Sequence, residues 1–330
     1  MRIHNPLARR WHILLGMIPI ILAVVIYALI SQARHKENPK DKLVPGLAQF
    51  SEGWKRITSR TSRELVDYTV REGDTLASVA AQFGDPETVQ AEILPTNGKD
   101  LIDWDDSIRE LEVGEILKIP SEVPVPLMEQ YLIVDTMQSL KRLTLGVVIG
   151  AFVALFFGLF MGCFTEFRAL FYTSVSALAK IPPLAILPII FLIRGVGEDA
   201  KIIIISLGIF PTMALDILLR VQEVHRELLI KAYTLGASTM EVVFKVIFPQ
   251  VLPGLIHSIR LALGPAWVFL IASEAIASEA GLGYRIFLVQ RQLGMNIILI
   301  YVVWIILLGL VMDLSLRGLL SWKFKWSEEK

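Results

Sequence analysis

Six long apolar runs dominate this sequence and limit what the chain can fold into. A helix needs about twenty consecutive apolar residues to cross the hydrocarbon core of a bilayer. Runs that qualify lie at about 12–31, 143–163, 171–193, 201–218, 259–278 and 296–315. The 54% hydrophobic content is therefore concentrated in segments of membrane-spanning length. We predict an all-α polytopic membrane protein with six transmembrane helices.

The flanks of these runs predict the orientation of the chain. The first run follows two arginines, exceeds the core of a signal peptide and precedes no A-x-A cleavage site, so we expect a retained anchor at 12–31. Short cytoplasmic segments are rich in Lys and Arg, which places 1–11, the loop at 219–258 and the C-terminal end in the cytoplasm. Residues 32–66 are also basic, but long loops cross largely regardless of charge, so they are expected to be an extracytoplasmic linker. The expected location is a bacterial cytoplasmic (inner) membrane.

Small residues spaced four apart follow one face of the second apolar run. They are Gly146, Gly150, Ala154, Gly158 and Gly162. Residues at i and i+4 share a helix face. Small side chains there let another helix backbone approach closely, so the stripe predicts helix packing within the subunit or between two subunits.

Prolines and one acidic residue are candidates for a translocation path. Pro182, Pro183 and Pro211 interrupt the third and fourth runs, and such breaks are tolerated where other helices or a cavity satisfy the freed carbonyls. Kinks that serve only packing are the alternative. Glu274 lies late in the fifth run, and an ionisable group in a span is a functional hypothesis by default. The alternative is a carboxylate near the outer interface, bonded to backbone or water.

The loop at 219–258 is too polar to span a membrane, yet it is patterned. Apolar residues recur at helical spacing until Gly236, which suits a helix C-cap or a turn with positive φ. Ser238, with Glu241 three residues later, forms a capping box that opens a second helix, expected to stop near Pro249. An ordinary connecting loop packed under the helices is the alternative.

This loop resembles the EAA signature of ABC importer permeases, E-A-A-x3-G-x9-I-x-L-P. Ile230 and Lys231 depart from the glutamate and the first alanine of the signature, while the glycine-to-proline spacing is intact. The resemblance implies a type I ABC importer permease fold and a loop that docks into a groove on an ATPase subunit. The residues to which it assigns ATPase coupling are Ala232, Tyr233, Leu235, Gly236, Ala237, Val246, Phe248 and Pro249.

Residues 128–320 as a whole resemble permeases of the sulfonate, taurine and nitrate type. The likeness is carried by the stretches 181–202 and 271–286 and by the start of the second run at 139–142. It implies a permease core with five of the transmembrane helices, a homodimer, two ATPase subunits inside and a solute-binding protein outside. Substrates in this family are mostly small organic sulfonates and oxoanions.

The sequence offers no energy-coupling chemistry of its own. It has no G-x4-G-K-[ST] phosphate loop, so ATP hydrolysis is expected in a partner subunit. We expect no catalytic residues, no metal site and no cofactor, and the chain is not expected to be an enzyme. A formal net charge of zero gives no electrostatic case for a nucleic-acid partner.

Residues 67–120 differ in composition from the rest of the chain, since they are acidic and polar and lie between two predicted membrane segments. The pattern predicts a β-α-α-β unit: a strand at 68–70, a helix capped by Asp74 or Thr75, a helix at about 85–93 and a strand at 116–119. The expected core consists of Val70, Leu76, Val79, Phe83, Ile93, Leu117 and Ile119.

This segment resembles LysM, a module that binds glycans containing N-acetylglucosamine. The matching residues are 68–70, 73–76, Asn97, 113–114 and 117–120. The resemblance implies an α+β LysM-like insertion on the extracytoplasmic side. It makes Gly73, Asp74, Thr75, Leu76 and Asn97 candidates for glycan binding.

The purpose of this insertion has two interpretations. It could tether the protein to peptidoglycan or shape a platform on which the binding protein docks. The long acidic connection at 98–110 slightly favours the platform. The retained loop at 73–75 favours the tether to peptidoglycan. The rival to an importer permease is a peptidoglycan-tethered structural membrane protein whose helices are an anchor.

Overall fold

The computed structural model describes residues 9–37, 44–58, 61–71, 73–83, 93, 111, 113–124, 130–291 and 294–327. The chain divides into two compact units, one of Met1–Trp54 with Val134–Lys330 and one of Lys55–Ile133.

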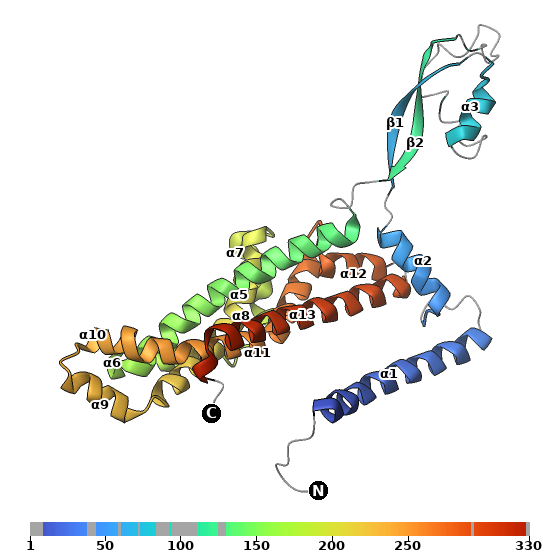
Figure 1. Cartoon of the computed structure of the whole chain (residues 1–330). Helices are drawn as coiled ribbons and strands as arrows, with labels where there is room; N and C mark the ends of the chain where they lie inside the picture. The colour runs from blue at the N-terminus through green and yellow to red at the C-terminus, as the bar shows by residue number, and fades with distance from the viewer. Residues whose placement is uncertain are drawn as a thin grey trace. The chain divides into compact units, whose positions relative to one another are not determined.

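The larger unit is helical (Figure 1). Its helices are α1 (Arg9–Glu37), α2 (Leu47–Thr58, which continues into the other unit), α5 (Tyr131–Cys163), α6 (Thr165–Leu178), α7 (Pro183–Arg194), α8 (Glu198–Gln222), α9 (Arg226–Thr234), α10 (Thr239–Glu241), α11 (Phe248–Ala277), α12 (Leu282–Gln290) and α13 (Met295–Lys323). A π-helical turn, η3 (Val242–Ile247), joins α10 to α11, and a 3-10 turn, η4 (Lys325–Ser327), follows α13.

Four helices in the described part of the chain are long and apolar enough to cross a membrane. They are Tyr131–Cys163, Glu198–Gln222, Thr239–Ile276 and Met295–Lys323. The bent pair α6 and α7 raises the number to five if the pair counts as one span. The first predicted run falls in α1, whose apolar stretch among the described residues is the shorter Ile21–Arg34. Six transmembrane helices therefore remain a prediction.

The third predicted run, 171–193, is interrupted at Pro182 and Pro183, as the sequence predicts, and it consists of the end of α6 and the whole of α7 instead of one straight helix. α6 and α7 meet at an angle of 98°. Pro182 is the N-cap of α7 in an extended conformation, with φ −62° and ψ 116°, and Pro183 takes the first helical position. A residue that precedes proline is pushed away from the α-helical region, so consecutive prolines end one helix and start the next in a new direction.

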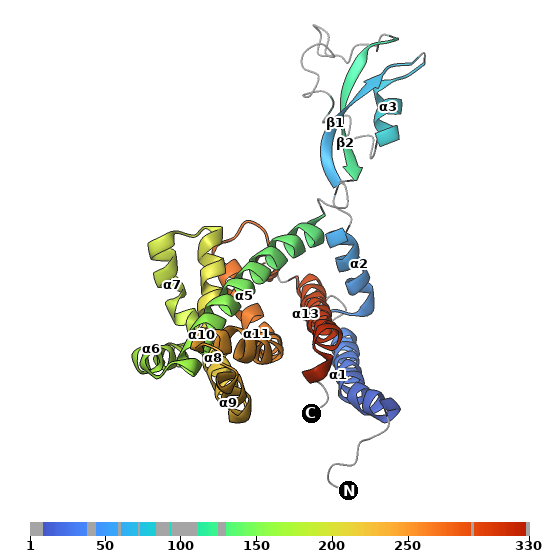
Figure 2. The same ribbon diagram turned by 60° about the vertical axis from the view of Figure 1, so that its left-hand side comes forward.

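The small-residue stripe of α5 packs against α8, which lies beside it (Figure 2). A Cβ atom added to Gly146 would lie 2.7 Å from the side chain of Ile205, and one added to Gly162 would lie 2.5 Å from Val221. Ser206 Oγ also donates to the Gly146 carbonyl, at 2.9 Å. The predicted packing role is confirmed, and it operates within the subunit.

The smaller unit contains two antiparallel strands and a helix. β1 (Thr61–Thr69) pairs with β2 (Ile116–Pro124) from Thr61↔Pro124 to Thr69↔Ile116, and α3 spans Leu76–Phe83. Both strands are longer than predicted, because the backbone ladder continues past the residues that cover the core. The second predicted helix lies outside the described residues except for Ile93, which is helical and buried.

The core of the smaller unit agrees with the predicted one. Its buried residues are Val70, Leu76, Val79, Ala80, Ile93, Leu117 and Ile119, with Phe83 partly buried against them. Thr75 is confirmed as the cap of α3, since its Oγ1 accepts from the Ser78 N–H at 3.2 Å.

The contact between α5 and α8 gives a stability prediction. Gly158→Ala should lower the free energy of unfolding by about 1–3 kcal/mol, the usual cost of overpacking. Its new Cβ would lie 2.6 Å from Ile217 and 2.7 Å from the Ala214 carbonyl, which is backbone and cannot move aside. The measurement is thermal unfolding in detergent. Gly264→Ala is the control, because a Cβ there meets nothing within 4 Å; equal melting temperatures for the two variants would contradict the packing.

Candidate functional site: the coupling loop

The loop between α8 and α11 folds into two short helices around a turn. α9 begins after His225, with Glu227 in its first turn and Lys231 in its last. Each of these charges opposes the partial charge of the nearer helix end, which stabilises the helix. None of the residues of α9 is buried within the chain. The helix therefore owes little to packing and presents most of its surface outward.

A Schellman motif ends α9. Gly236 N–H donates to the Tyr233 carbonyl at 2.9 Å, and Ala237 N–H donates to the Ala232 carbonyl at 3.1 Å. Gly236 has φ 82°, in the left-handed region where a Cβ atom is unfavourable. The positive φ expected from the sequence is confirmed, and five of the candidate coupling residues lie in this one turn, with Leu235 as the C-cap of α9.

The next helix starts with the predicted capping box. Ser238 Oγ accepts from the Glu241 N–H at 3.3 Å, and the Ser238 N–H donates to Glu241 Oε2 at 3.0 Å. Lys245 Nζ lies 2.8 Å from Glu241 Oε1. The reciprocal bonds satisfy backbone donors that a helix N-terminus otherwise leaves open.

The expectation that this second helix stops near Pro249 is wrong. The chain passes from α10 through η3 directly into α11, where Pro249 sits in the first turn. Proline has no N–H to donate and its ring crowds the preceding turn. The wider π-helical turn takes up that disruption, so the helix continues through the proline. Val246, Phe248 and Pro249 are half-buried along this continuous path.

The outward surface of the loop is apolar at its centre. Ile230 is 64% exposed, Tyr233 49% and Leu235 88%. Exposed apolar side chains grouped on one short helix are typical of a protein–protein interface, and an aromatic residue is a common energetic centre of such interfaces. Ile230 occupies the place of the signature glutamate, so this surface offers an apolar group there.

The comparison with protein families assigns the core of the chain. Residues 146–322, more than half of the sequence, match the family of binding-protein-dependent transport system inner membrane components. This chain belongs to that family. Residues 68–120 match the LysM domain. The identification of a multi-pass inner-membrane permease with an inserted LysM module is confirmed.

Curated relatives agree with the family. The chain is 33% identical over 202 residues to a "Probable ABC transporter permease protein" of Brucella abortus (strain 2308), covering 61% of this chain and 81% of that protein. It is 34% identical over 149 residues to the taurine transport system permease protein TauC of Escherichia coli (strain K12), covering 45% of this chain and 54% of that protein.

A solved structure agrees with the fold. A chain of the inward-facing MetNI methionine ABC transporter superimposes with a TM-score of 0.52 at 20% sequence identity, covering 58% of this chain and 95% of that chain. At this identity the match establishes the fold of an ABC transporter permease and nothing finer.

The candidate path residues of this permease lie in separate places. Pro182 and Pro183 form the bend before α7, and Pro211 is buried inside α8. A cavity of about 360 Å³ between α8 and α11 has Asp216 and Ser258 in its wall. Ser258 Oγ donates to Asp216, which also accepts from Arg220 Nε at 2.8 Å.

Glu274 is fully buried and belongs to an ionic cluster that the sequence analysis missed. Arg142 Nη1 donates to Glu274 Oε1 at 2.7 Å, and Arg142 also binds both carboxylate oxygens of Glu198. Ser139 Oγ and the Gly283 N–H donate to the Glu274 carboxylate at 2.7 and 2.8 Å. Glu274 therefore has partners on α5 and α12, while its role in a translocation path stays a prediction.

The cluster continues around Asp135, which is also fully buried. Its carboxylate accepts from Arg285 Nε at 2.9 Å, from the Tyr301 hydroxyl at 3.0 Å and from the Gly281 N–H at 2.9 Å. Lys201 Nζ completes the set, 2.8 Å from Glu198. We call Asp135, Arg142, Glu198, Lys201, Glu274 and Arg285 the buried ionic cluster; the Glu198 side chain lies at its edge and is 54% exposed. Its partners are up to 150 residues apart in sequence, so no local spacing could reveal it.

The candidate glycan residues form the turn that enters α3. Gly73 has φ 90°, and Asp74 Oδ2 accepts from the Arg71 N–H at 2.9 Å and the Tyr68 hydroxyl at 2.8 Å. The Arg71 backbone bond and the Tyr68 bond hold the pKa of Asp74 below its usual range. Leu76 is in the core, and Asn97 lies outside the described residues. Residues 73–76 thus form the turn before α3 and contribute to the core, and glycan binding stays a prediction.

The buried ionic cluster gives a second stability prediction. Arg142→Met should cost about 3–5 kcal/mol of unfolding free energy, because it leaves the Glu274 carboxylate buried without its cation. Arg194→Gln breaks only an exposed pair, 3.7 Å from Asp199, and should change stability by less than about 0.5 kcal/mol. Denaturation of both variants in detergent measures the difference; similar losses would argue against a stabilising cluster.

Proposed function

We propose that this chain is the membrane-spanning subunit of an ATP-driven importer, working as a homodimer with two ATPase subunits and an extracytoplasmic solute-binding protein. The observation that carries the proposal is the exposed, apolar and locally rigid coupling loop. α9 has the caps and turn of a well-formed helix but no residue buried within the chain. Such a surface fits docking into a groove on another protein.

The continuous helix beyond the turn supports a transmission role. Thr239–Ile276 is 38 residues long, which corresponds to about 57 Å at the α-helical rise. A displacement of α9 by a closing ATPase would pass through the Schellman turn and the capping box into this helix. The helix ends next to Glu274 of the buried ionic cluster, so the movement would reach the opposite end of the permease.

The names of relatives support a proposal for the class of solute. Besides the taurine permease, they include a permease for aliphatic sulfonates in Bacillus subtilis (strain 168) and a bicarbonate transport system permease of Synechococcus elongatus. These solutes are small and carry an anionic oxygen group. We propose an organic sulfonate or a related oxoanion for this chain.

A structural anchor tethered to peptidoglycan is the competing function. An anchor would not require an exposed apolar helix on a rigid turn, so the coupling loop favours transport. The chain has no phosphate-binding loop in its sequence, and the proposal places ATP hydrolysis in the partner subunit.

Gly236→Leu should uncouple the complex. A side chain at φ 82° costs about 1–2 kcal/mol and would loosen the turn between α9 and α10. Nothing lies within 4 Å of the new Cβ, so the effect would come from the backbone and not from a clash. We expect reduced solute uptake and reduced solute-stimulated ATP hydrolysis in proteoliposomes.

Gly236→Asn is the matched control, because asparagine tolerates the left-handed conformation. It should retain most of the coupling. Wild-type uptake by the leucine variant, in a complex that copurifies with its ATPase, would count against the coupling role.

The LysM module is proposed to face the extracytoplasmic side and to contact peptidoglycan. The family match and the intact 73–76 turn support glycan contact. The alternative role is a platform on which the binding protein docks. One module should bind weakly, and two copies in a homodimer would gain by effective concentration.

Membrane vesicles of opposite orientation test both statements. Right-side-out vesicles that contain the transporter should be retained on purified peptidoglycan, and inside-out vesicles should not. Vesicles with a chain that lacks 61–124 are the control for nonspecific retention. Retention from the inside-out preparation would overturn the orientation, and no retention from either would favour the docking platform.

A further inference from the structure

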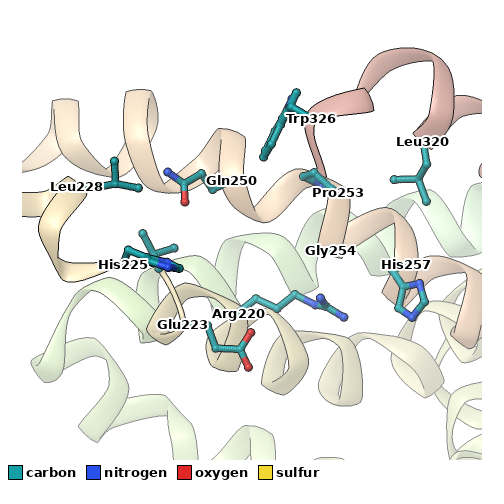
Figure 3. Close-up of a pocket in the computed structure, with 11 residues that line it drawn as sticks. Arg220, Glu223, His225, Leu228, Gln250, Pro253, Gly254, His257, Leu320 and Trp326 are labelled. Carbon is teal, nitrogen blue, oxygen red and sulfur yellow. The ribbon is translucent and has the colours of Figure 1, made fainter. Parts of the chain in front are cut away.

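A cavity of about 680 Å³ lies where the coupling loop meets the ends of three long helices (Figure 3). Its wall comes from the end of α8, the start of α9, the first turns of α11 and the C-terminal segment around η4. Small-molecule sites in proteins commonly occupy about 300–1,000 Å³. The cavity is therefore large enough for a small organic solute.

Apolar side chains form part of the wall. Leu228 comes from α9, Leu320 from α13 and Trp326 from η4 (Figure 3). α9 is far in sequence from α13 and η4, and the cavity is where it meets them. An apolar wall with a few polar groups is the usual composition of a ligand pocket.

The polar groups of the cavity have unused hydrogen-bonding capacity. Arg220 donates through Nε to Asp216 at 2.8 Å, and within the described residues its two Nη atoms have no hydrogen-bond partner. The same holds, over the described chain, for the side chains of Glu223, Gln250 and His257. A guanidinium with two free nitrogens is suited to bind a carboxylate or sulfonate by two parallel bonds.

The absence of a side chain at Gly254 leaves room for the Arg220 side chain. A Cβ atom added to Gly254 would lie 2.4 Å from Arg220 Cδ and 2.9 Å from its Nε. Figure 3 shows the Arg220 side chain extended beneath Gly254 in the direction of His257. The close approach of α8 and α11 at this glycine thus fixes the cation of the cavity.

We infer that this cavity binds a small zwitterion. Its anionic oxygen group would pair with the free nitrogens of Arg220, with His257 and Gln250 as further hydrogen-bonding groups. Its ammonium group would face Glu223, the C-cap residue of α8, which has helical backbone angles and lies three residues after Arg220, on the same side of the helix end. Asp216 neutralises Arg220 in part, and Glu223 would repel a simple anion, so a ligand with both charges fits better than an anion alone.

A ligand in this cavity, beside the coupling loop, would affect transport. A ligand there contacts α9, α11 and the C-terminal segment at once, and so would restrain the coupling helix against the membrane helices. This consequence rests on the proposed function, which places the cavity on the cytoplasmic side and makes its ligand a solute of that side. Binding itself requires neither the ATPase nor the solute-binding protein.

The test is a binding assay on the purified full chain in nanodiscs. Radiolabelled 3-aminopropanoate is the probe, and unlabelled propanoate and propylamine are the competitors, since each lacks one of its two charges. We expect saturable binding of the probe and competition about tenfold weaker by either single-charge compound, because each forfeits a charge-assisted pair.

Three variants and one control locate the site. Arg220→Gln should abolish binding, and Glu223→Gln should erase the preference for the zwitterion over propanoate. Gly254→Ala should weaken binding by displacing Arg220 while all charges remain. This variant therefore tests the site even if Arg220→Gln misfolds. Arg226→Gln changes an exposed arginine of α9 outside the cavity wall and should bind as the wild type does.

Two results would overturn the inference. One is the absence of saturable binding to the wild-type chain; the other is an equal loss in Arg226→Gln and Arg220→Gln. Neither result bears on the coupling test at Gly236, which measures ATP hydrolysis and uptake, so failure of this site and failure of the transport function are distinguishable.

Discussion

The guanidinium of Arg142 is almost completely buried, and the arrangement of five helices depends on how it is neutralised. Its partners Glu198 and Glu274 come from the start of α8 and the end of α11. Through Ser139 and Asp135, the same face of α5 also holds the backbone that starts α12 and the hydroxyl of Tyr301 on α13. A buried charge without partners is strongly destabilising, so the pairs of Arg142 with Glu198 and Glu274 favour the packing of α5 against α8 and α11.

A different interaction holds the rest of α5. Beyond the buried ionic cluster, its small residues let α8 approach until side chains such as Ile209 fill the space left by Gly150. In a bilayer, apolar burial gives little driving force between helices, because lipid is as apolar as the side chains. Close packing and buried polar contacts therefore hold the helices together. α5 uses buried polar contacts at the ionic cluster and close packing along its small residues.

The opposite end of the unit is built for contact with other molecules. α9 has no buried residue, and the cavity beside it has polar groups with unused bonding capacity. The capping box and the Schellman turn keep this region folded without packing, because they satisfy backbone groups locally. Local bonds hold the shape of the loop, and its side chains stay exposed on the surface where we propose that an ATPase docks.

The sequence by itself determined the local features: the positive φ of Gly236, the capping box of Ser238 and the core of the LysM module. Each depends on residues a few positions apart or on hydrophobic periodicity, which the sequence states directly. Only the tertiary structure decided that α6 and α7 bend by 98°, that the chain continues through Pro249, and that Glu274 meets Arg142. The direction after a proline depends on the helix against which the next segment packs, and α7 packs mainly on α8. The partner of a buried charge can lie more than a hundred residues away, as Glu274 does from Arg142. Spacing along the chain does not encode either neighbour.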